Sequence, residues 1–184
     1  MIDVRTLEID GVLEIITRKF ADDRGFFSET YNWQEFSDAG IHHTFVQDNH
    51  SCSNFKGVLR GLHYQLPPFA QTKLVRVVKG AILDVAVDIR RSSPTFLKWV
   101  SLEISAEKWN QLLVPAGFAH GFVTLEDDTE VIYKVTELYS AAHDRSIRFD
   151  DPTIGIRWPS HLTDLHLSDK DRSAELVSNA EVFA

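Results

Sequence analysis

Short runs rich in β-branched and aromatic residues follow one another along most of the chain, separated by turn-forming residues. Several alternate apolar and polar positions, as half-buried strands do, and few repeat with the period of a helix. The pattern predicts strands over Val12–Phe20, Phe26–Tyr31, Val58–Gln65, Lys73–Val78, Ala81–Ile89, Phe96–Ile104, Gln111–Val114, Ala119–Leu125 and Glu130–Tyr139. Many short strands at this spacing are typical of a β-sandwich or a β-barrel.

Turn and helix signals complete this picture. Lys79-Gly80 separates two alternating runs, and glycine supplies the positive φ that tight reversals need, so we expect a hairpin there. Helix is predicted only at Trp33–Ala39, closed by Gly40, and from Ser168 through the C-terminal segment. Both helices should be peripheral.

The expected fold is all-β, a cupin-like jelly-roll β-barrel with a few short peripheral helices. An immunoglobulin-like sandwich stays open as an alternative, although the paired cysteines of the antibody type are missing. The chain contains no internal repeat and no linker rich in proline, serine or glycine. We therefore expect one domain over residues 1–184.

Charge and cysteine content narrow the classes of partner. The net charge of −8 argues against general affinity for nucleic acid or for an anionic membrane surface, since both require a positive field. Cys52 is the only cysteine and the N-terminus lacks the apolar core of a secretory signal, so a cytoplasmic location is expected. The most apolar segment, Leu74–Ile89, is interrupted by charged residues and predicts no membrane span.

Two motifs resemble those of metal-binding cupins, G-x5-H-x-H-x(3,4)-E-x6-G and P-x-G-x-x-H. His63 stands at the first ligand position and Gly80 at the closing glycine, and the segment from Pro115 to His120 reproduces the second motif. The second histidine has become Gln65, and Lys73 occupies the glutamate position. An ammonium competes with a metal ion for the site and offers no lone pair while protonated, so a metal-free site without cofactor is expected.

The remaining candidate side chains carry imidazole, ammonium and phenol groups, which can form and stabilise an enolate without a metal ion. Strand parity turns Tyr133 and Tyr139 onto the same face as Val131 and Val135, and Lys73 onto the face of Val75 and Val77, so these faces should point inward. Arg60 and His63 have opposite parity. A bulge at Gly61 would allow both to face the interior.

Five segments in the same order resemble the dTDP-4-dehydrorhamnose 3,5-epimerase family. They are Asp23–Glu29, Gln47–Asn49, Arg60–Gln65, Pro115–Phe122 and Tyr133–Tyr139, with Leu167–Asp171 matching the last element of the family. The resemblance covers nearly the whole chain. It implies a cofactor-free homodimeric isomerase that converts a dTDP-linked 4-keto-6-deoxyhexose, dTDP-4-dehydro-6-deoxy-D-glucose, to dTDP-4-dehydro-L-rhamnose in dTDP-L-rhamnose biosynthesis.

The resemblance also implies roles for individual residues. His63 resembles the general base, with Asp171 as the carboxylate that orients it, and Tyr133 resembles the acid that returns a proton from the opposite face. Lys73 would stabilise the charge that grows on the keto oxygen. The residues that resemble substrate-binding positions are Arg24, Glu29, Gln47, Asn49, Arg60, Lys73, His120, Tyr139, Asp144 and Lys170.

Several alternative interpretations stay open at this stage. Ser168 and Asp171 also match a helix capping box, and the tyrosines could simply fill a core. Ala141-Ala142 and Ser146 depart from the residues common in the family, which leaves the contacts of this loop, including Asp144, undecided. The remaining histidines, His42, His43, His50, His143, His161 and His166, show no interpretable spacing, which favours structural or solvated roles.

Three other functions compete with double epimerisation. The first is a mono-epimerase that inverts only C3 or C5 of another deoxysugar nucleotide. The second is a metal-dependent cupin isomerase or dioxygenase, and the third is a nucleotide-sugar binding module without activity. Isotope exchange at the sugar carbons separates the first and third from the double epimerase, and elemental analysis separates the second.

Overall fold

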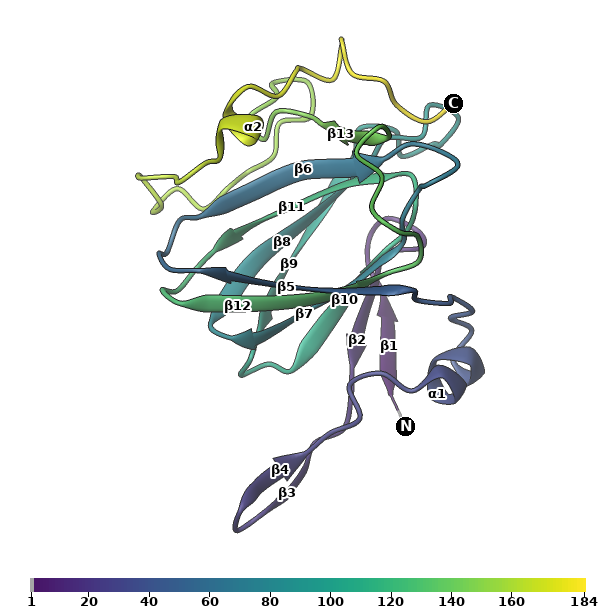
Figure 1. Ribbon diagram of the computed structural model, residues 1–184, viewed down its shortest axis with the longest axis vertical. Coiled ribbons are helices and arrows are strands. Elements are labelled where there is room, and N and C mark those ends of the chain that lie inside the picture. Colours follow the sequence, from purple (N-terminus) through teal and green to yellow (C-terminus); the bar gives the residue numbers. More distant parts are fainter. Residues whose placement is uncertain (1) are drawn as a thin grey trace.

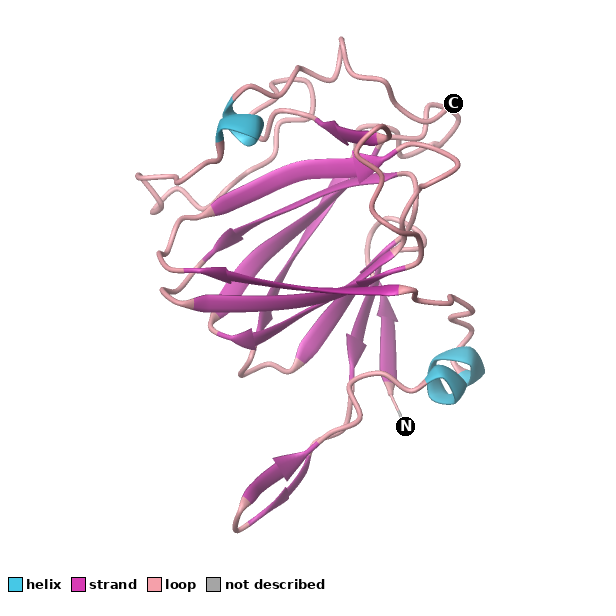
Figure 2. Ribbon diagram, viewed as in Figure 1, coloured by secondary structure: helices cyan, strands magenta, loops and turns pink. Residues whose placement is uncertain are grey.

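The computed structural model describes residues 2–184, whose strands form two facing antiparallel sheets (Figures 1 and 2). The six-stranded sheet has the order β1-β2-β10-β7-β12-β5, and the five-stranded sheet has the order β13-β6-β11-β8-β9. A third pair, β3 and β4, forms a separate hairpin that projects from the barrel. This architecture is the predicted cupin-like jelly roll with short peripheral helices.

The strands are β1 (Asp3–Thr6), β2 (Leu13–Ile16), β3 (Phe20–Asp22), β4 (Gly25–Phe27), β5 (Gln47–Ser53), β6 (Leu59–Gln65), β7 (Lys73–Lys79), β8 (Ala81–Asp88), β9 (Trp99–Ser105), β10 (Asn110–Val114), β11 (Phe118–Thr124), β12 (Thr129–Val135) and β13 (Asp144–Ser146). The helices are α1 (Trp33–Asp38) and α2 (Asp169–Arg172). No helix among residues 2–184 is long and apolar enough to span a membrane.

Three apolar clusters hold these layers together. The largest lies between the sheets, where Val75 and Leu112 of one sheet meet Ile82 and Phe122 of the other. A second lies on the outer face of the five-stranded sheet, under the C-terminal segment that crosses the top of Figure 1. The third joins α1 to the outer face of the six-stranded sheet. Central strands such as β8 are therefore apolar on both faces, which explains their strong signal in the sequence.

The predicted hairpin at Lys79-Gly80 is wrong. β7 pairs with β10 and β12, whereas β8 pairs with β11 and β9, so the turn carries the chain from one sheet to the other. The turn does require glycine at position 80. Gly80 has φ +78°, and an added Cβ would lie 2.4 Å from Oγ1 of Thr129. A turn signal identifies the reversal but not the strand that will be the partner.

The predicted bulge at Gly61 is confirmed. His63 pairs with His120 and Arg60 pairs with Phe122, so β6 has one residue more than β11 between these two pairs. An added Cβ on Gly61 would lie 2.5 Å from the Cα of Gly121, which excludes a larger residue. The bulge lets Arg60 and His63 face the interior together.

The C-terminal helix is much shorter than predicted. α2 spans only Asp169–Arg172, and the chain beyond it is irregular, with a turn at residues 177–179. Its backbone groups bond to other segments, as where Arg148 donates to the carbonyl of Glu175 and Arg91 to that of Phe183. Val177 and Phe183 pack on the sheet instead of forming one helical face, because contact with the sheet outweighs local helix formation.

Four strands, β1, β3, β5 and β13, lie outside the predicted ranges except for Phe20 of β3, and β12 ends before Tyr139. β5 reads Gln-Asp-Asn-His-Ser-Cys-Ser and has no apolar run, yet its burial alternates along the strand. It is an edge strand whose inward row carries polar side chains. Tyr139, which was expected to continue the β12 row, instead lies on the loop that follows.

Candidate active site

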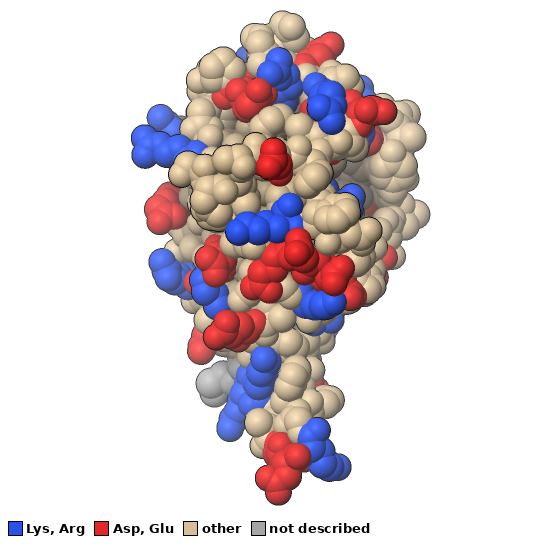
Figure 3. Space-filling model, turned by 90° about the vertical axis from the view of Figure 1, so that its left-hand side faces the viewer, with Lys and Arg blue, Asp and Glu red and all other residues tan. Residues whose placement is uncertain are grey.

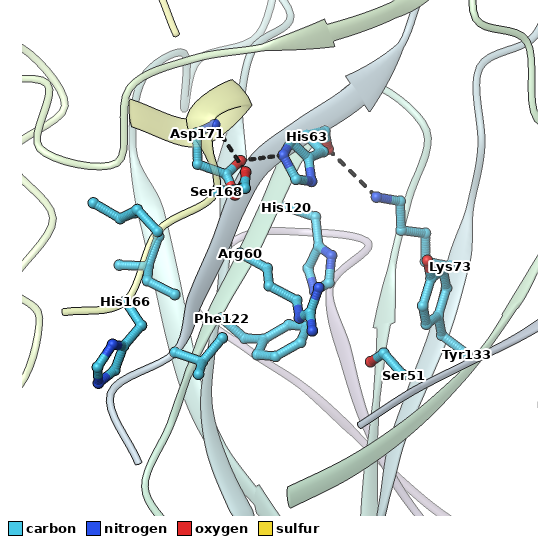
Figure 4. A pocket seen from close by; sticks show the side chains of 13 residues that line it. Ser51, Arg60, His63, Lys73, His120, Phe122, Tyr133, His166, Ser168 and Asp171 are labelled. Atoms are coloured by element: carbon cyan, nitrogen blue, oxygen red, sulfur yellow. Dashed lines mark hydrogen bonds and ion pairs between the residues drawn. The ribbon is translucent and has the colours of Figure 1, made fainter. Parts of the chain in front are cut away.

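A cavity of about 470 Å³ opens between the edges of the two sheets. The residues that line it are Ser51, Val58, Leu59, Arg60, His63, Lys73, His120, Phe122, Tyr133, His166, Leu167, Ser168 and Asp171 (Figure 4). Arg60, His63 and His120 come from the five-stranded sheet, whereas Lys73 and Tyr133 come from the six-stranded sheet. The five-stranded sheet therefore contributes imidazole and guanidinium groups to the cavity, and the six-stranded sheet contributes an ammonium and a phenol.

His63 is hydrogen-bonded to a carboxylate that is distant in sequence. Its Nε2 lies 2.5 Å from Oδ1 of Asp171, while the Ser168 hydroxyl donates to Oδ2 of Asp171 at 2.7 Å. The bond holds the tautomer that is protonated on Nε2, which leaves the lone pair on Nδ1. Burial opposes ionisation of Asp171, but hydrogen bonds from His63 and Ser168 outweigh it, so the pKa of this carboxyl is lowered.

The capping and orienting interpretations of Asp171 are compatible. Ser168 is the N-cap of α2, and its Oγ accepts a hydrogen bond from the backbone N–H of Asp171. The single turn of α2 thus presents the Asp171 carboxylate to His63. One residue takes part in the cap and in the imidazole contact.

Lys73 begins β7 and is buried in the cavity wall. Its Nζ lies 3.4 Å from the carbonyl oxygen of His63, which accepts a hydrogen bond from it. Burial lowers the pKa of Lys73 to about 8, although the carboxylates of Asp84 and Asp144 oppose this shift. The cavity therefore contains an ammonium that is protonated at neutral pH and close to its titration range.

Tyr133 lies on β12, on the side of the cavity opposite His63 (Figure 4). Burial raises the pKa of its hydroxyl, with the positive charge of Arg60 opposing. The phenol stays protonated at neutral pH and can act as a proton donor. Arg60 itself donates to the Ser53 hydroxyl and to the carbonyl of Cys52.

A second imidazole–carboxylate pair lies beside the first. His120 is the cross-strand neighbour of His63, and its Nε2 lies 2.5 Å from Oδ1 of Asp84. Burial lowers the pKa of His120, although the carboxylate of Asp84 opposes this. Asp84 is 0% exposed, and its Oδ2 has no hydrogen-bond partner among residues 2–184. Its charge acts on the cavity from behind, where it also favours the protonated form of Lys73.

A polar hollow of about 260 Å³ adjoins the cavity and shares His63, Lys73 and Tyr133 with it. The other residues around this hollow are Gln47, Asn49, Tyr64, Gln65, Gln71, Tyr139, Asp144 and Lys170. Asp144 accepts hydrogen bonds from Lys170 at 2.5 Å and from the hydroxyl of Tyr139 at 3.3 Å. Because they share these three residues, the cavity and the hollow form one continuous site with room for a ligand of several parts.

All but two of the residues expected at the site border the cavity or the hollow. The exceptions are Arg24 and Glu29, which belong to the β3–β4 hairpin and the segment after it. The hairpin points away from the cavity in Figure 1, and Figure 3 shows it as a narrow projection with acidic and basic side chains at its tip. Arg24 pairs there with Asp22, and its side chain is 90% exposed.

The sequence did not lead us to assign Asp84 or the apolar wall of Phe122 to the site, and Ser168 was expected only as a helix cap. Asp84 had a visible signal, a carboxylate between apolar residues in the middle of β8. His166, expected to be structural or solvated, borders the cavity next to Phe55, with ring centroids 5.4 Å apart. Across residues 2–184, no group of three or more His, Cys, Asp or Glu side chains is placed to hold a metal ion.

The jelly roll and its cavity, with an imidazole–carboxylate pair facing a phenol and an ammonium, define a cupin-like protein equipped for proton transfer. Residues 6–179 match the sequence model of the dTDP-4-dehydrorhamnose 3,5-epimerase family. The chain belongs to this family of isomerases.

Individual relatives agree over nearly the full length. The dTDP-4-dehydrorhamnose 3,5-epimerase of Sinorhizobium fredii is 54% identical, with 92% of this chain and 86% of the relative covered. The crystal structure of the enzyme from Bacillus anthracis, with TDP and PPi bound, has a TM-score of 0.92 at 48% identity and covers 96% of this chain and 99% of its own. A 3'-monoepimerase of Streptomyces bikiniensis in complex with dTDP-quinovose is more distant, with 34% identity and a TM-score of 0.87 over 95% and 87% of the two chains.

Proposed function

We propose that this protein epimerises dTDP-4-dehydro-6-deoxy-D-glucose at C3 and C5 to dTDP-4-dehydro-L-rhamnose, a step of dTDP-L-rhamnose biosynthesis. The main observation is that His63 and Tyr133 come from opposite sheets and line one cavity, which Lys73 also lines. A solved relative from Legionella pneumophila, 41% identical with a TM-score of 0.93 over 98% of this chain and 95% of its own, contains dTDP-4-keto-L-rhamnose. The ligand of that relative is, like the proposed substrate and product, a dTDP-linked 4-keto-6-deoxyhexose.

The reaction requires two proton transfers at each carbon. Nδ1 of His63 takes the proton from the carbon beside the ketone, and the carbon–hydrogen electron pair moves into the ring to form an enolate. Asp171 stabilises the resulting imidazolium, and the Lys73 ammonium stabilises the charge on the former keto oxygen. Tyr133 then donates its proton to the opposite face of the carbon, which inverts the centre. Proton exchange with solvent restores both groups.

Deuterium labelling tests this function directly. In D₂O the protein should incorporate label at both C3 and C5 of the sugar, measured by NMR after reduction of the product. One of the relatives is a 3'-monoepimerase, so inversion of a single carbon is the main alternative function. An enzyme of that kind would incorporate label at one position only. Binding of substrate without any exchange would mean a binding module and would contradict the proposal.

The loss of activity at basic pH should follow deprotonation of Lys73. Its pKa of about 8 lies below the ordinary value of 10.5, so the protonated form needed by the enolate is lost as pH rises through about 8. We expect kcat/KM, which reports ionisation of the free enzyme, to fall across this range. The burial-raised pKa keeps the Tyr133 phenol protonated there. The Lys73→Arg variant keeps its charge to pH values above about 12, so its remaining activity should not show this fall; a fall unchanged from wild type would exclude Lys73 as its source.

We also propose a homodimer, acting in the cytoplasm as a single domain, in which the β3–β4 hairpin of one subunit completes the site of the other. Exposed aromatic residues on the hairpin, Phe20, Phe26 and Phe27, favour burial against a second copy. The hairpin would then carry Arg24 and Glu29 to the partner's substrate.

Mixing inactive Arg24→Ala and His63→Asn subunits should restore about a quarter of wild-type activity, since half of random dimers have one intact site out of two. No recovery would argue against a shared site.

A further inference from the structure

Gln65 occupies the position at which metal-binding cupins have their second histidine, and the proposed chemistry gives it no task. Its side chain ends β6 at the polar hollow and is only 4% exposed. Nε2 donates to the carbonyl oxygens of Phe69 at 2.7 Å and Leu138 at 3.2 Å, and Oε1 accepts from the backbone N–H of Ser140 at 2.7 Å. Both amide hydrogens are thus used, and so is the carbonyl.

These bonds connect three separate parts of the chain. Gln65 ties the end of β6 to the loop that precedes β7 and to the loop that follows β12. Two of the bonds reach Leu138 and Ser140, the residues on either side of Tyr139. The backbone N–H of Tyr139 in turn donates to Oε1 of Gln47 at 3.1 Å. Three polar contacts thus hold the backbone of residues 138–140, which lie outside the strands and helices of the described chain.

The ring of Tyr139 depends on this backbone more than on packing. The residue is 62% exposed, and its hydroxyl contacts Asp144, which also accepts from Lys170. An exposed aromatic ring beside a polar hollow offers a flat surface on which a planar heterocycle can stack. A loop that is ordered before binding does not need to be ordered by the ligand, which makes binding stronger.

We propose that Gln65 is a positioning residue, which holds the 138–140 segment so that Tyr139 receives the nucleotide end of the substrate. The inference rests on the proposed function, because it assumes a nucleotide-linked sugar. It assigns to Gln65 a structural task at the position where a metal-binding cupin has a ligand. Loss of Gln65 should therefore weaken binding of the nucleotide and leave proton transfer between His63 and Tyr133 largely intact.

The Gln65→Met variant keeps the side-chain volume and removes all three hydrogen bonds. We expect the Kd for dTDP, measured by calorimetry, and the KM for the keto sugar to rise about tenfold, with kcat within about twofold of wild type. Asn110→Leu is the matched control. Asn110 is 3% exposed and its amide also makes three bonds, to Glu14, Glu103 and Ser105, away from the cavity. This control should lower Tm without changing Kd or KM.

A double-mutant cycle with Tyr139→Ala shows whether Gln65 acts through Tyr139. In the Tyr139→Ala background, Gln65→Met should change the Kd for dTDP by less than about twofold. Additive effects of the two substitutions, a fall in kcat equal to the fall in kcat/KM, or an equal rise in Kd for Asn110→Leu would overturn the inference. The dTDP measurements need no turnover, so a wild-type protein without epimerase activity would contradict the proposed function and leave this test readable.

Discussion

Replacing His63 with asparagine should lower turnover by on the order of 10³-fold or more and should abolish deuterium exchange at C3 and at C5. Both inversions begin when a base removes a proton, and Nδ1 of His63 is the nitrogen left free by the bond to Asp171. Asparagine has a similar size and can still donate to the carboxylate, so the loss should come from the missing base. Turnover is measured with a downstream reductase by consumption of NADPH, and exchange is measured by NMR in D₂O.

The exposed His161 offers a matched substitution outside the cavity. His161→Asn should behave as wild type in both assays. Binding of dTDP to the His63→Asn variant should be nearly unchanged, which would show an intact site. Exchange at either carbon within about tenfold of wild type would assign the base to another residue.

Replacing Tyr133 with phenylalanine should separate proton removal from inversion. His63 can still take the proton and return a deuteron to the same face, so exchange should continue while formation of the L-sugar falls by about 10²- to 10⁴-fold. The burial that raises the pKa of Tyr133 keeps its hydroxyl protonated at the pH of the assay. The measurement compares label in recovered substrate with the amount of inverted product.

Tyr31→Phe removes the same atom outside the cavity, where the ring of Tyr31 packs edge-on against Phe36 and Phe45. It should leave both exchange and inversion at wild-type rates. If Tyr133→Phe lost exchange together with inversion, Tyr133 would be needed for proton removal as well. Inversion at a rate near wild type would mean that another group supplies the proton.

At two positions of the site this chain has different residues from the metal-binding cupin motif. Lys73 supplies positive charge where a cupin motif has a glutamate, and in the proposed mechanism the burial that lowers its pKa also strengthens its action on the enolate. The carboxylate of Asp84, behind the wall, opposes that shift and so favours the protonated ammonium. Gln65, in place of a second histidine, bonds to two loops.

The sequence by itself determined the class of fold and most of the residues at the site. Apolar runs such as those of β7 and β8 predict strands, because burial on both faces leaves little room for polar residues. Gln65 and Lys73 replace a histidine and a glutamate of the metal-binding cupin motif. Because a protonated lysine cannot coordinate a metal ion, this replacement predicts a site made of protein side chains alone. The parity conflict between Arg60 and His63 even predicts the bulge, since side chains alternate along any regular strand.

The tertiary structure alone decided which distant residues meet. Asp171 reaches His63 across 108 positions, and Asp84 lies behind His120, through pairings that depend on the whole barrel. β5 forms because its neighbour β12 supplies hydrogen bonds, although its own residues are polar. The turn at Gly80 joins two sheets, and Arg24 lies far from the cavity. Local patterns encode conformation and exposure, whereas partner choice is a property of packing between segments that the sequence keeps apart.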